Sequence, residues 1–434
     1  MSVAKVKRLR VAISLPRCQV SDLYSSSGTW SRRRSARPMT SSFRKNSSRV
    51  EIVLLRHAEV LRSILTIKLE RVQIYGWRSC CAGNHPSHLQ GRMGYSGFGT
   101  GDYSSATGTF WTYSMSSTRI DVHAHFLPSF YRDALIEAGM SQPDGMPAIP
   151  QWSEQTALST MDRLGIGTAM LSVSSPGVHF GDDVKACSLA RRVNEEGARL
   201  VSAHAGRFGL FASLPVPDID GALRELDYAM DVLKADGVVL ETNHGGVYLG
   251  DAKLEPLYAE LNRRKAVIFI HPTSPSCTCC DSLSLGYPRP MLEFMFETTR
   301  SITNLLLSGA LDRHADLRVI VPHAGAALPV LADRVVRLMP ILGDAVQTTP
   351  DHFFALLRRL YYDLAGAPIP RLLPALLEIA DADHIMYGSD WPFTPAALVE
   401  SLASDLDGTE IVDADVKQQF LYRNASKLFP RLAR

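Results

Sequence analysis

The chain has 434 residues, of which 46% are hydrophobic and 21% charged, and its formal net charge is +2. Its seven cysteines are odd in number and scattered, which argues against a disulfide-built secreted scaffold and favours a reducing compartment. No stretch reaches the roughly 18 consecutive apolar residues of a membrane span. We therefore expect a globular protein of the cytoplasm that does not cross a membrane.

The near-neutral net charge conceals a division at about residue 118. Residues 1–118 carry 18 Lys and Arg against 5 Asp and Glu, and the remainder carries 28 against 39. The first segment is rich in Ser, Arg and Gly without sustained periodicity, so we expect a disordered basic leader, either a tail or an upstream extension of the gene model. An organelle transit peptide is a further interpretation of this composition. The acidic remainder argues against nucleic acid as a partner.

From Arg119 onward, short apolar runs alternate with segments of helical spacing, such as Leu254, Leu257, Tyr258 and Leu261. The runs expected to form strands are Arg119–His125, Thr168–Ser174, Phe208–Leu214, Gly237–Thr242, Ala266–His271, Arg318–His323, Leu360–Leu364 and His384–Asp390. Eight strand-then-helix units over residues 119–434 predict an α/β fold, a (β/α)8 TIM barrel with short insertions. An open, doubly wound sheet is the alternative.

Polar residues close several of these expected strands. His125, His271, His323 and Asp390 each occupy the last position of one. In a barrel, the carboxyl ends of the strands converge on one face, where active sites are found. An open sheet would spread the same residues along a crevice. The distribution of these residues therefore favours the barrel.

The first expected strand carries two histidines, His123 and His125, on either side of Ala124. Because side chains alternate along a strand, both imidazoles point to the same side. Imidazole suits Zn²⁺ and other first-row metals, and a catalytic site needs about three or four protein ligands. His271 and Asp390 would complete that set, so the sequence predicts a metal site at the mouth of the barrel.

Four segments carry a family resemblance: Asp121-Val122-His123-Ala124-His125, Ile270-His271-Pro272, Pro322-His323-Ala324-Gly325 and Gly388-Ser389-Asp390-Trp391-Pro392. Together they resemble the amidohydrolase-2 branch of the amidohydrolase superfamily. Within that branch the chain resembles the aminocarboxymuconate semialdehyde decarboxylase-like group, and more specifically the fungal 6-methylsalicylate decarboxylases. Segments that favour this subgroup include Ile149-Pro150-Gln151-Trp152, Tyr248-Leu249-Gly250 and Glu297-Thr298-Thr299-Arg300.

The resemblance implies that His123, His125, His271 and Asp390 hold one Zn²⁺, or Mn²⁺ as in some relatives, without an organic cofactor. It implies that His323 is a catalytic acid/base. The implied reaction is nonoxidative decarboxylation of a small aromatic acid, 6-methylsalicylate, to 3-methylphenol and CO₂. Either His323 or Asp390 could protonate the ring carbon, and the sequence leaves this choice open.

The resemblance also implies that Arg334 reaches the substrate carboxylate of a neighbouring subunit, hence a homodimer; an ordinary solvated arginine is the alternative. Relatives that act on a dicarboxylate carry a second arginine where this chain has Ile149. An apolar residue there favours a monocarboxylate. Phe296, Trp391 and His244 are further candidates for contact with the substrate, although aromatic residues of this kind are more often part of the core.

Two other functions are compatible with the pattern. The first is a metal-dependent hydrolase of a lactone or amide, in which the metal activates water on the same barrel. The second is a barrel that only binds a ligand. The decarboxylase-like segments argue against the hydrolase, and intact metal-ligand residues at the matched strand ends argue against a noncatalytic binding barrel.

Overall fold

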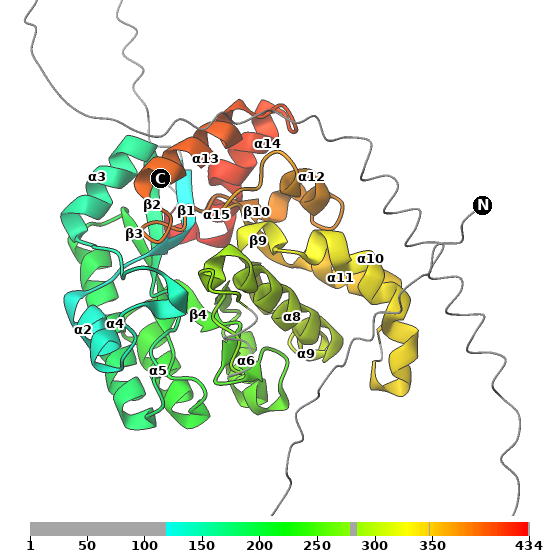
Figure 1. The fold of residues 1–434 in the computed structure, drawn as a ribbon, viewed down its shortest axis with the longest axis horizontal. Helices are drawn as coiled ribbons and strands as arrows, with labels where there is room; N and C mark the ends of the chain where they lie inside the picture. Colours follow the sequence, from blue (N-terminus) through cyan, green and yellow to red (C-terminus); the bar gives the residue numbers. More distant parts are fainter. Residues whose placement is uncertain (1–118, 278–283, 347, 433–434) are drawn as a thin grey trace, which may run out of the picture. The chain divides into compact units, whose positions relative to one another are not determined.

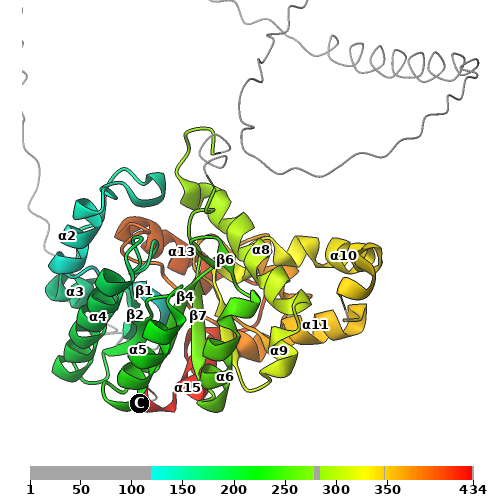
Figure 2. The same cartoon turned by 90° about the horizontal axis from the view of Figure 1, so that it is seen from below.

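Eight parallel strands surrounded by helices make up the body of the protein in a computed structural model, which describes residues 119–277, 284–346 and 348–432 (Figures 1 and 2). The expected leader, residues 1–118, lies outside the described residues. The strands are β1 Arg119–His125, β2 Ile166–Ser172, β3 Phe208–Ser213, β4 Gly237–Glu241, β7 Val267–His271, β8 Arg318–Val321, β9 Tyr361–Asp363 and β10 Ile385–Met386.

Each of these strands pairs in parallel with the next one in that order. The ends of the sheet also meet, because Val122 of β1 donates its N–H to the carbonyl of Tyr387, just after β10, at 3.0 Å. His125 N–H donates in the same way to the carbonyl of Trp391 at 2.9 Å. Since β1 is bonded on both sides, the sheet closes on itself. The predicted (β/α)8 barrel is confirmed, and the open sheet is excluded.

Helices follow the strands and form the outer layer. The longer ones are α2 Ser129–Glu137, α3 Glu154–Leu164, α4 Asp183–Ala203, α5 Ile219–Asp231, α6 Glu255–Arg263, α8 Glu293–Leu307, α10 Leu328–Leu338, α11 Pro350–Arg359 and α13 Ala396–Gly408. Shorter ones are α9 Ala310–Arg313, α12 Leu372–Leu377, α14 Ala414–Gln418 and α15 Asn424–Leu428. None of the helices in the described part of the chain combines the length and apolar character that a membrane crossing requires.

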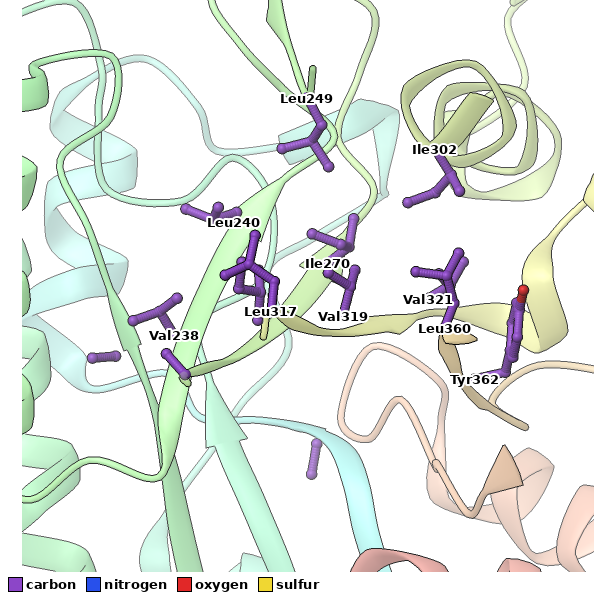
Figure 3. Packing of buried hydrophobic residues seen from close by; sticks show 14 of the residues in the cluster. Val238, Leu240, Leu249, Ile270, Ile302, Leu317, Val319, Val321, Leu360 and Tyr362 are labelled. Atoms are coloured by element: carbon purple, nitrogen blue, oxygen red, sulfur yellow. The ribbon is translucent and has the colours of Figure 1, made fainter. Parts of the chain in front are cut away.

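The alternation of side chains along the strands creates two apolar cores. Val238, Leu240 and Ile270 point outward and pack with Ile302 of α8 between barrel and helices (Figure 3). Val239 and Phe269 point inward and belong to the core inside the barrel, which Phe429, beyond α15, joins. A barrel of eight strands is just wide enough to be filled by such side chains. These side chains fill the barrel interior beneath the polar residues at the carboxyl ends of the strands.

Several of the strand boundaries expected from the sequence are wrong. Strand β8 ends at Val321, two residues before His323, and β10 ends at Met386, four residues before Asp390. His323 and Asp390 have φ values of 56° and 58°, which lie in the left-handed region and cannot continue a strand. The expectation that these two residues end strands was therefore wrong, whereas His125 and His271 do end β1 and β7.

Candidate metal centre

Four side chains meet at the carboxyl end of the barrel: His123 and His125 from β1, His271 from β7 and Asp390 from the loop after β10. One ligand atom from each lies within 4.8 Å of those of the other three. Asp390 Oδ1 is 3.2 Å from His125 Nε2 and 3.5 Å from His123 Nε2. The histidines are buried, and the Asp390 side chain is 19% exposed, so the group lies under the surface of the mouth.

Strand β1 presents both of its histidines to the barrel axis, as alternation predicts, and their ring centroids are 5.0 Å apart. The strand is not regular, however, because its register against β2 shifts between Asp121 and Ala124. Irregularities of this kind re-aim side chains and are common beside active sites. The ring of Phe269 lies 4.8 Å from the ring of His123 and forms an apolar floor beneath it.

His123 and His125 each have a polar partner at Nδ1, and a buried carboxylate lies near Nδ1 of His271. Asp363 Oδ2 lies 2.9 Å from His123 Nδ1, and Ser172 Oγ lies 3.0 Å from His125 Nδ1. Glu241 Oε2 lies 3.5 Å from His271 Nδ1. Such partners fix the orientation and the tautomer of a metal-binding imidazole. The rings of His123 and His125 are therefore held with Nε2 toward Asp390, whereas His271 Nε2 lies 3.3 Å from Ser174 Oγ and His271 Nδ1 has no hydrogen-bond partner in the described part of the chain.

The donor set fits a divalent first-row cation. His123 Nε2 is buried without a hydrogen-bond partner, which is costly unless something else satisfies it. Burial lowers the pKa of His125 and, more strongly, that of His271, so these imidazoles are neutral and can donate a lone pair. Three imidazoles and one carboxylate are a ligand set that Zn²⁺ and related ions accept.

His323 lies beside this group without belonging to it. Its Nε2 is 3.8 Å from Asp390 Oδ2, and its ring centroid is 5.0 Å from that of His123. The backbone N–H of His323 donates to Asp363 Oδ1 at 3.0 Å, so one carboxylate holds both His123 and the turn that carries His323. Left-handed residues of this kind cluster at functional sites, where the surroundings stabilise them.

A cavity of about 440 Å³ adjoins this group, and two of the four side chains, His271 and Asp390, line it. Its polar walls include His271, His323 and Asp390, and its apolar walls come from Met146, Met291, Phe294, Met295, Leu372 and Phe393. We call it the metal cavity. Among the residues that the structure describes, no lysine or arginine lines it. The space is of a size that small-molecule sites commonly have.

The four residues expected to contact substrate do not line this cavity. Phe296 is 42% exposed, because it lies two positions along α8 from the inward-facing Phe294. Trp391 is directed to the space between α3 and β2. His244, in the hairpin of β5 (Asn243–His244) and β6 (Val247–Tyr248), lines a separate cavity. Arg334 is exposed on α10.

Sequence reasoning missed two carboxylates at the site. Glu241 ends β4 in an otherwise apolar run, a signal that resembles the one used for the histidines. Asp144 lies in the turn Pro143–Gly145 and lines the metal cavity from a distant loop. A Pro-Asp-Gly sequence indicates a turn, but it does not indicate where the turn lies. Only the fold brings Asp144 to the mouth of the barrel.

Comparison with known proteins identifies the family. The amidohydrolase family model Amidohydro_2 matches residues 120–431. The 6-methylsalicylic acid decarboxylase of Penicillium expansum is 36% identical over 318 residues, which cover 72% of this chain and 97% of that protein. The 6-methylsalicylic acid decarboxylase of Aspergillus aculeatus is 38% identical over 324 residues, covering 73% and 97%.

Two solved structures share the fold of this chain. The crystal structure of an amidohydrolase II superposes with a TM-score of 0.68 at 34% identity, over 72% of this chain and 99% of that one. The dihydroxybenzoic acid decarboxylase of Polaromonas sp., solved with manganese and 2-nitroresorcinol, has a TM-score of 0.61 at 23% identity, over 72% and 96%. The second likeness concerns the fold alone. On the family match and the identity to its relatives, the chain belongs to the amidohydrolase-2 family.

Proposed function

We propose that this protein is a metal-dependent, nonoxidative decarboxylase that converts 6-methylsalicylate to 3-methylphenol and CO₂. The observation that carries the proposal is the group of His123, His125, His271 and Asp390 within 4.8 Å, with His323 lining the same cavity as His271 and Asp390. The relatives named 6-methylsalicylic acid decarboxylase, at 36% and 38% identity, support the choice of reaction.

The lining of the metal cavity supports a small aromatic monocarboxylate as substrate. Methionine and phenylalanine side chains form much of its wall and suit an aromatic ring with a methyl group. A second carboxylate would need a cationic partner, and none of the described lining residues supplies one. Ile149, at the place of the second arginine in dicarboxylate-specific relatives, is buried in the core with 4% exposure.

His323 is the proton donor that we propose. A bound divalent ion would supply Lewis-acid charge to the carboxylate and the adjacent phenol oxygen. His323 then gives its proton to the ring carbon that bears the carboxylate, and the new C–H bond interrupts the aromatic system. The C–C bond breaks next, its electron pair returns to the ring, aromaticity is restored and CO₂ leaves. Asp390 is the less suitable donor, because Oδ1 faces His125 and Oδ2 accepts a hydrogen bond from Thr394.

We propose Zn²⁺ as the ion, with Mn²⁺ as the alternative. Three nitrogen donors and one oxygen donor suit Zn²⁺ well. The Polaromonas decarboxylase was solved with manganese, which keeps the second ion in consideration. Metal analysis of the purified protein, followed by reconstitution of the stripped protein with each ion separately, would decide between them.

We also propose a homodimer in which Arg334 completes the partner's site. Val330, Arg334 and Leu338 are spaced by four residues and share one face of α10. Val330 is 68% exposed and Leu338 40%, and Ile341, just beyond the helix, is 78% exposed. Exposed apolar rows of this kind mark interaction surfaces. Helix α10 lies at the periphery of the barrel (Figures 1 and 2), where a second subunit could approach it.

The test is to incubate the purified full-length protein with 6-methylsalicylate and Zn²⁺ or Mn²⁺, and to measure CO₂ and 3-methylphenol. In D₂O, the product should carry one deuterium on the carbon that held the carboxylate, because protonation of that carbon is a required step. A product without ring deuterium would contradict the mechanism. Hydrolysis of lactones without any decarboxylation would contradict the proposed function.

A further inference from the structure

A second cavity, of about 560 Å³, lies next to the metal cavity. Its walls come from the loops after β2 and β3, from the end of β4 and from the β5–β6 hairpin. Asp144 is the one residue common to the described linings of the two cavities. The carboxylate of Asp144 therefore stands at the boundary between them.

The boundary consists of hydrogen-bonded side chains. Asp144 Oδ1 accepts hydrogen bonds from the backbone N–H of Ser274, at 3.2 Å, and from the Ser274 hydroxyl, so it reaches from its own turn to the loop after β7. Beside this contact, Ser175 Oγ lies 2.7 Å from Thr273 Oγ1. Because Asp144 borders both cavities, its side chain is the one whose removal is expected to join the two spaces.

The backbone holds Asp144 in this position. Its φ is 56° and that of Gly145 is 75°, so two successive residues of the turn are left-handed. Asp tolerates this conformation better than most residues with a side chain, and Gly adopts it without strain. Loops with such residues are often fixed at binding sites. A glycine at position 144 would therefore keep the turn while removing the carboxylate.

One part of the wall of the second cavity is apolar. Val178, Leu214, Val216 and Val239 line it, and each is buried. Polar groups line other parts, among them the buried Glu241 and Asn243. A chain of a few methylene groups would gain by leaving water for this space, by about 0.8 kcal/mol per buried CH₂ in general. The apolar part of the wall thus suits an alkyl substituent.

We propose that Asp144 is a specificity-determining residue, which limits the alkyl substituent of the aromatic acid by closing the second cavity to the metal cavity. The second cavity is then a subsite for an alkyl chain longer than methyl, available only when the Asp144 side chain is absent. This inference rests on the proposed function, since it assumes that a salicylate binds in the metal cavity.

The test compares the binding of salicylate and 6-propylsalicylate to the full-length protein saturated with Zn²⁺, by isothermal titration calorimetry, with every protein, including the one unchanged at position 144, carrying His323→Asn so that neither compound is decarboxylated during the titration. In Asp144→Gly, the ratio of the two dissociation constants should shift by about tenfold or more in favour of the propyl compound, a size typical of apolar discrimination. Asp144→Asn keeps the size of the side chain and should keep the ratio of the unchanged protein. Adding Val178→Phe to Asp144→Gly should cancel the gain by filling the subsite.

Three outcomes would overturn the inference. An unchanged ratio in Asp144→Gly would mean that Asp144 does not set the limit. An equal shift in Asp144→Asn would mean that charge, and not size, is responsible. If the unchanged protein binds no salicylate, the proposed function fails and the inference fails with it. If salicylate binds and Asp144→Gly leaves the ratio of the dissociation constants unchanged, the proposed function stands and only the inference fails.

Discussion

His123 Nδ1 lies 2.9 Å from Asp363 Oδ2, and neither side chain is exposed to solvent. A carboxylate accepts hydrogen bonds, so Nδ1 of His123 must carry the hydrogen, and in the neutral imidazole this leaves the lone pair on Nε2. Nε2 is the atom that faces Asp390, at 3.5 Å. Asp363 thus selects the tautomer of His123 that can bind a metal ion.

Asp363→Asn should weaken metal binding by about 10–100-fold. Asn Oδ1 can still accept from the backbone N–H of His323 and Ala365, but its amide would present a donor to His123 Nδ1. The imidazole would then carry its hydrogen on Nε2, where the ion must bind. Competition with a chromophoric chelator measures the affinity. Glu225→Gln, at a buried carboxylate of α5, is the matched control, and equal affinity in both variants would contradict the tautomer argument.

His125→Asn and His323→Asn should lose activity for different reasons. His125→Asn removes a proposed ligand, so bound metal and decarboxylation should be lost together. His323→Asn should keep the metal and lower kcat by about 100–10,000-fold, as expected for loss of a general acid. Metal content of the dialysed proteins and initial rates of CO₂ release distinguish loss of the metal from loss of the general acid. Loss of the metal from His323→Asn would place His323 among the ligands.

Arg334→Ala and His323→Asn should complement each other if Arg334 serves the partner's site. Each variant alone should be nearly inactive. A mixed dimer has one complete site, formed by the His323 of one subunit and the Arg334 of its partner, so co-expression should restore roughly a quarter of the activity for random pairing. The rate of the co-purified mixture checks this. No recovery beyond the sum of the two variants would indicate that Arg334 is a solvated surface residue.

The pair of helices α6 and α9 predicts a pH-dependent contribution to stability. Glu255 Oε1 lies 2.9 Å from Arg313 Nε and 2.8 Å from His314 Nε2. Hydrogen bonding from Arg313 is the largest influence on Glu255; partial burial opposes it and hydrogen bonding from His314 adds to it, so that the pKa falls from 4.5 to about 2. Because the folded pKa is the lower one, the stabilisation is present above the unfolded value and is lost as the pH falls from about 4.5 to about 2.

Glu255→Gln should therefore be less stable than the unchanged protein at pH 7 and equally stable near pH 2. Urea midpoints measured across this pH range would show whether the difference vanishes. Glu410→Gln, at an exposed acid far along the chain, is the control and should show little difference at any pH. A difference between Glu255→Gln and the unchanged protein that does not depend on pH would indicate a packing effect of the substituted side chain, unrelated to charge.

The helical and strand periodicities predicted most of the barrel, because local side-chain patterns reflect which face is buried. These periodicities failed where the tertiary structure, and not the local sequence, decides the burial or the backbone conformation of a residue. Leu328, Leu331, Val335 and Leu338 of α10 have helical spacing, yet Leu328 is buried while Leu338 is 40% exposed. Helical spacing alone does not tell whether an apolar face meets the core or another surface. His323 and Asp390 were expected inside strands for a similar reason, since left-handed φ values leave no mark on apolar periodicity.

The sequence by itself determined the eight-unit order of the fold and the four side chains that meet at its mouth, because strand ends in a closed barrel must converge. The tertiary structure alone decided how these groups are oriented. The pairing of Asp363 with His123 spans 240 residues, and that of Asp144 with Ser274 spans 130. Contacts between such distant segments depend on where loops lie in space, and no local spacing encodes that position.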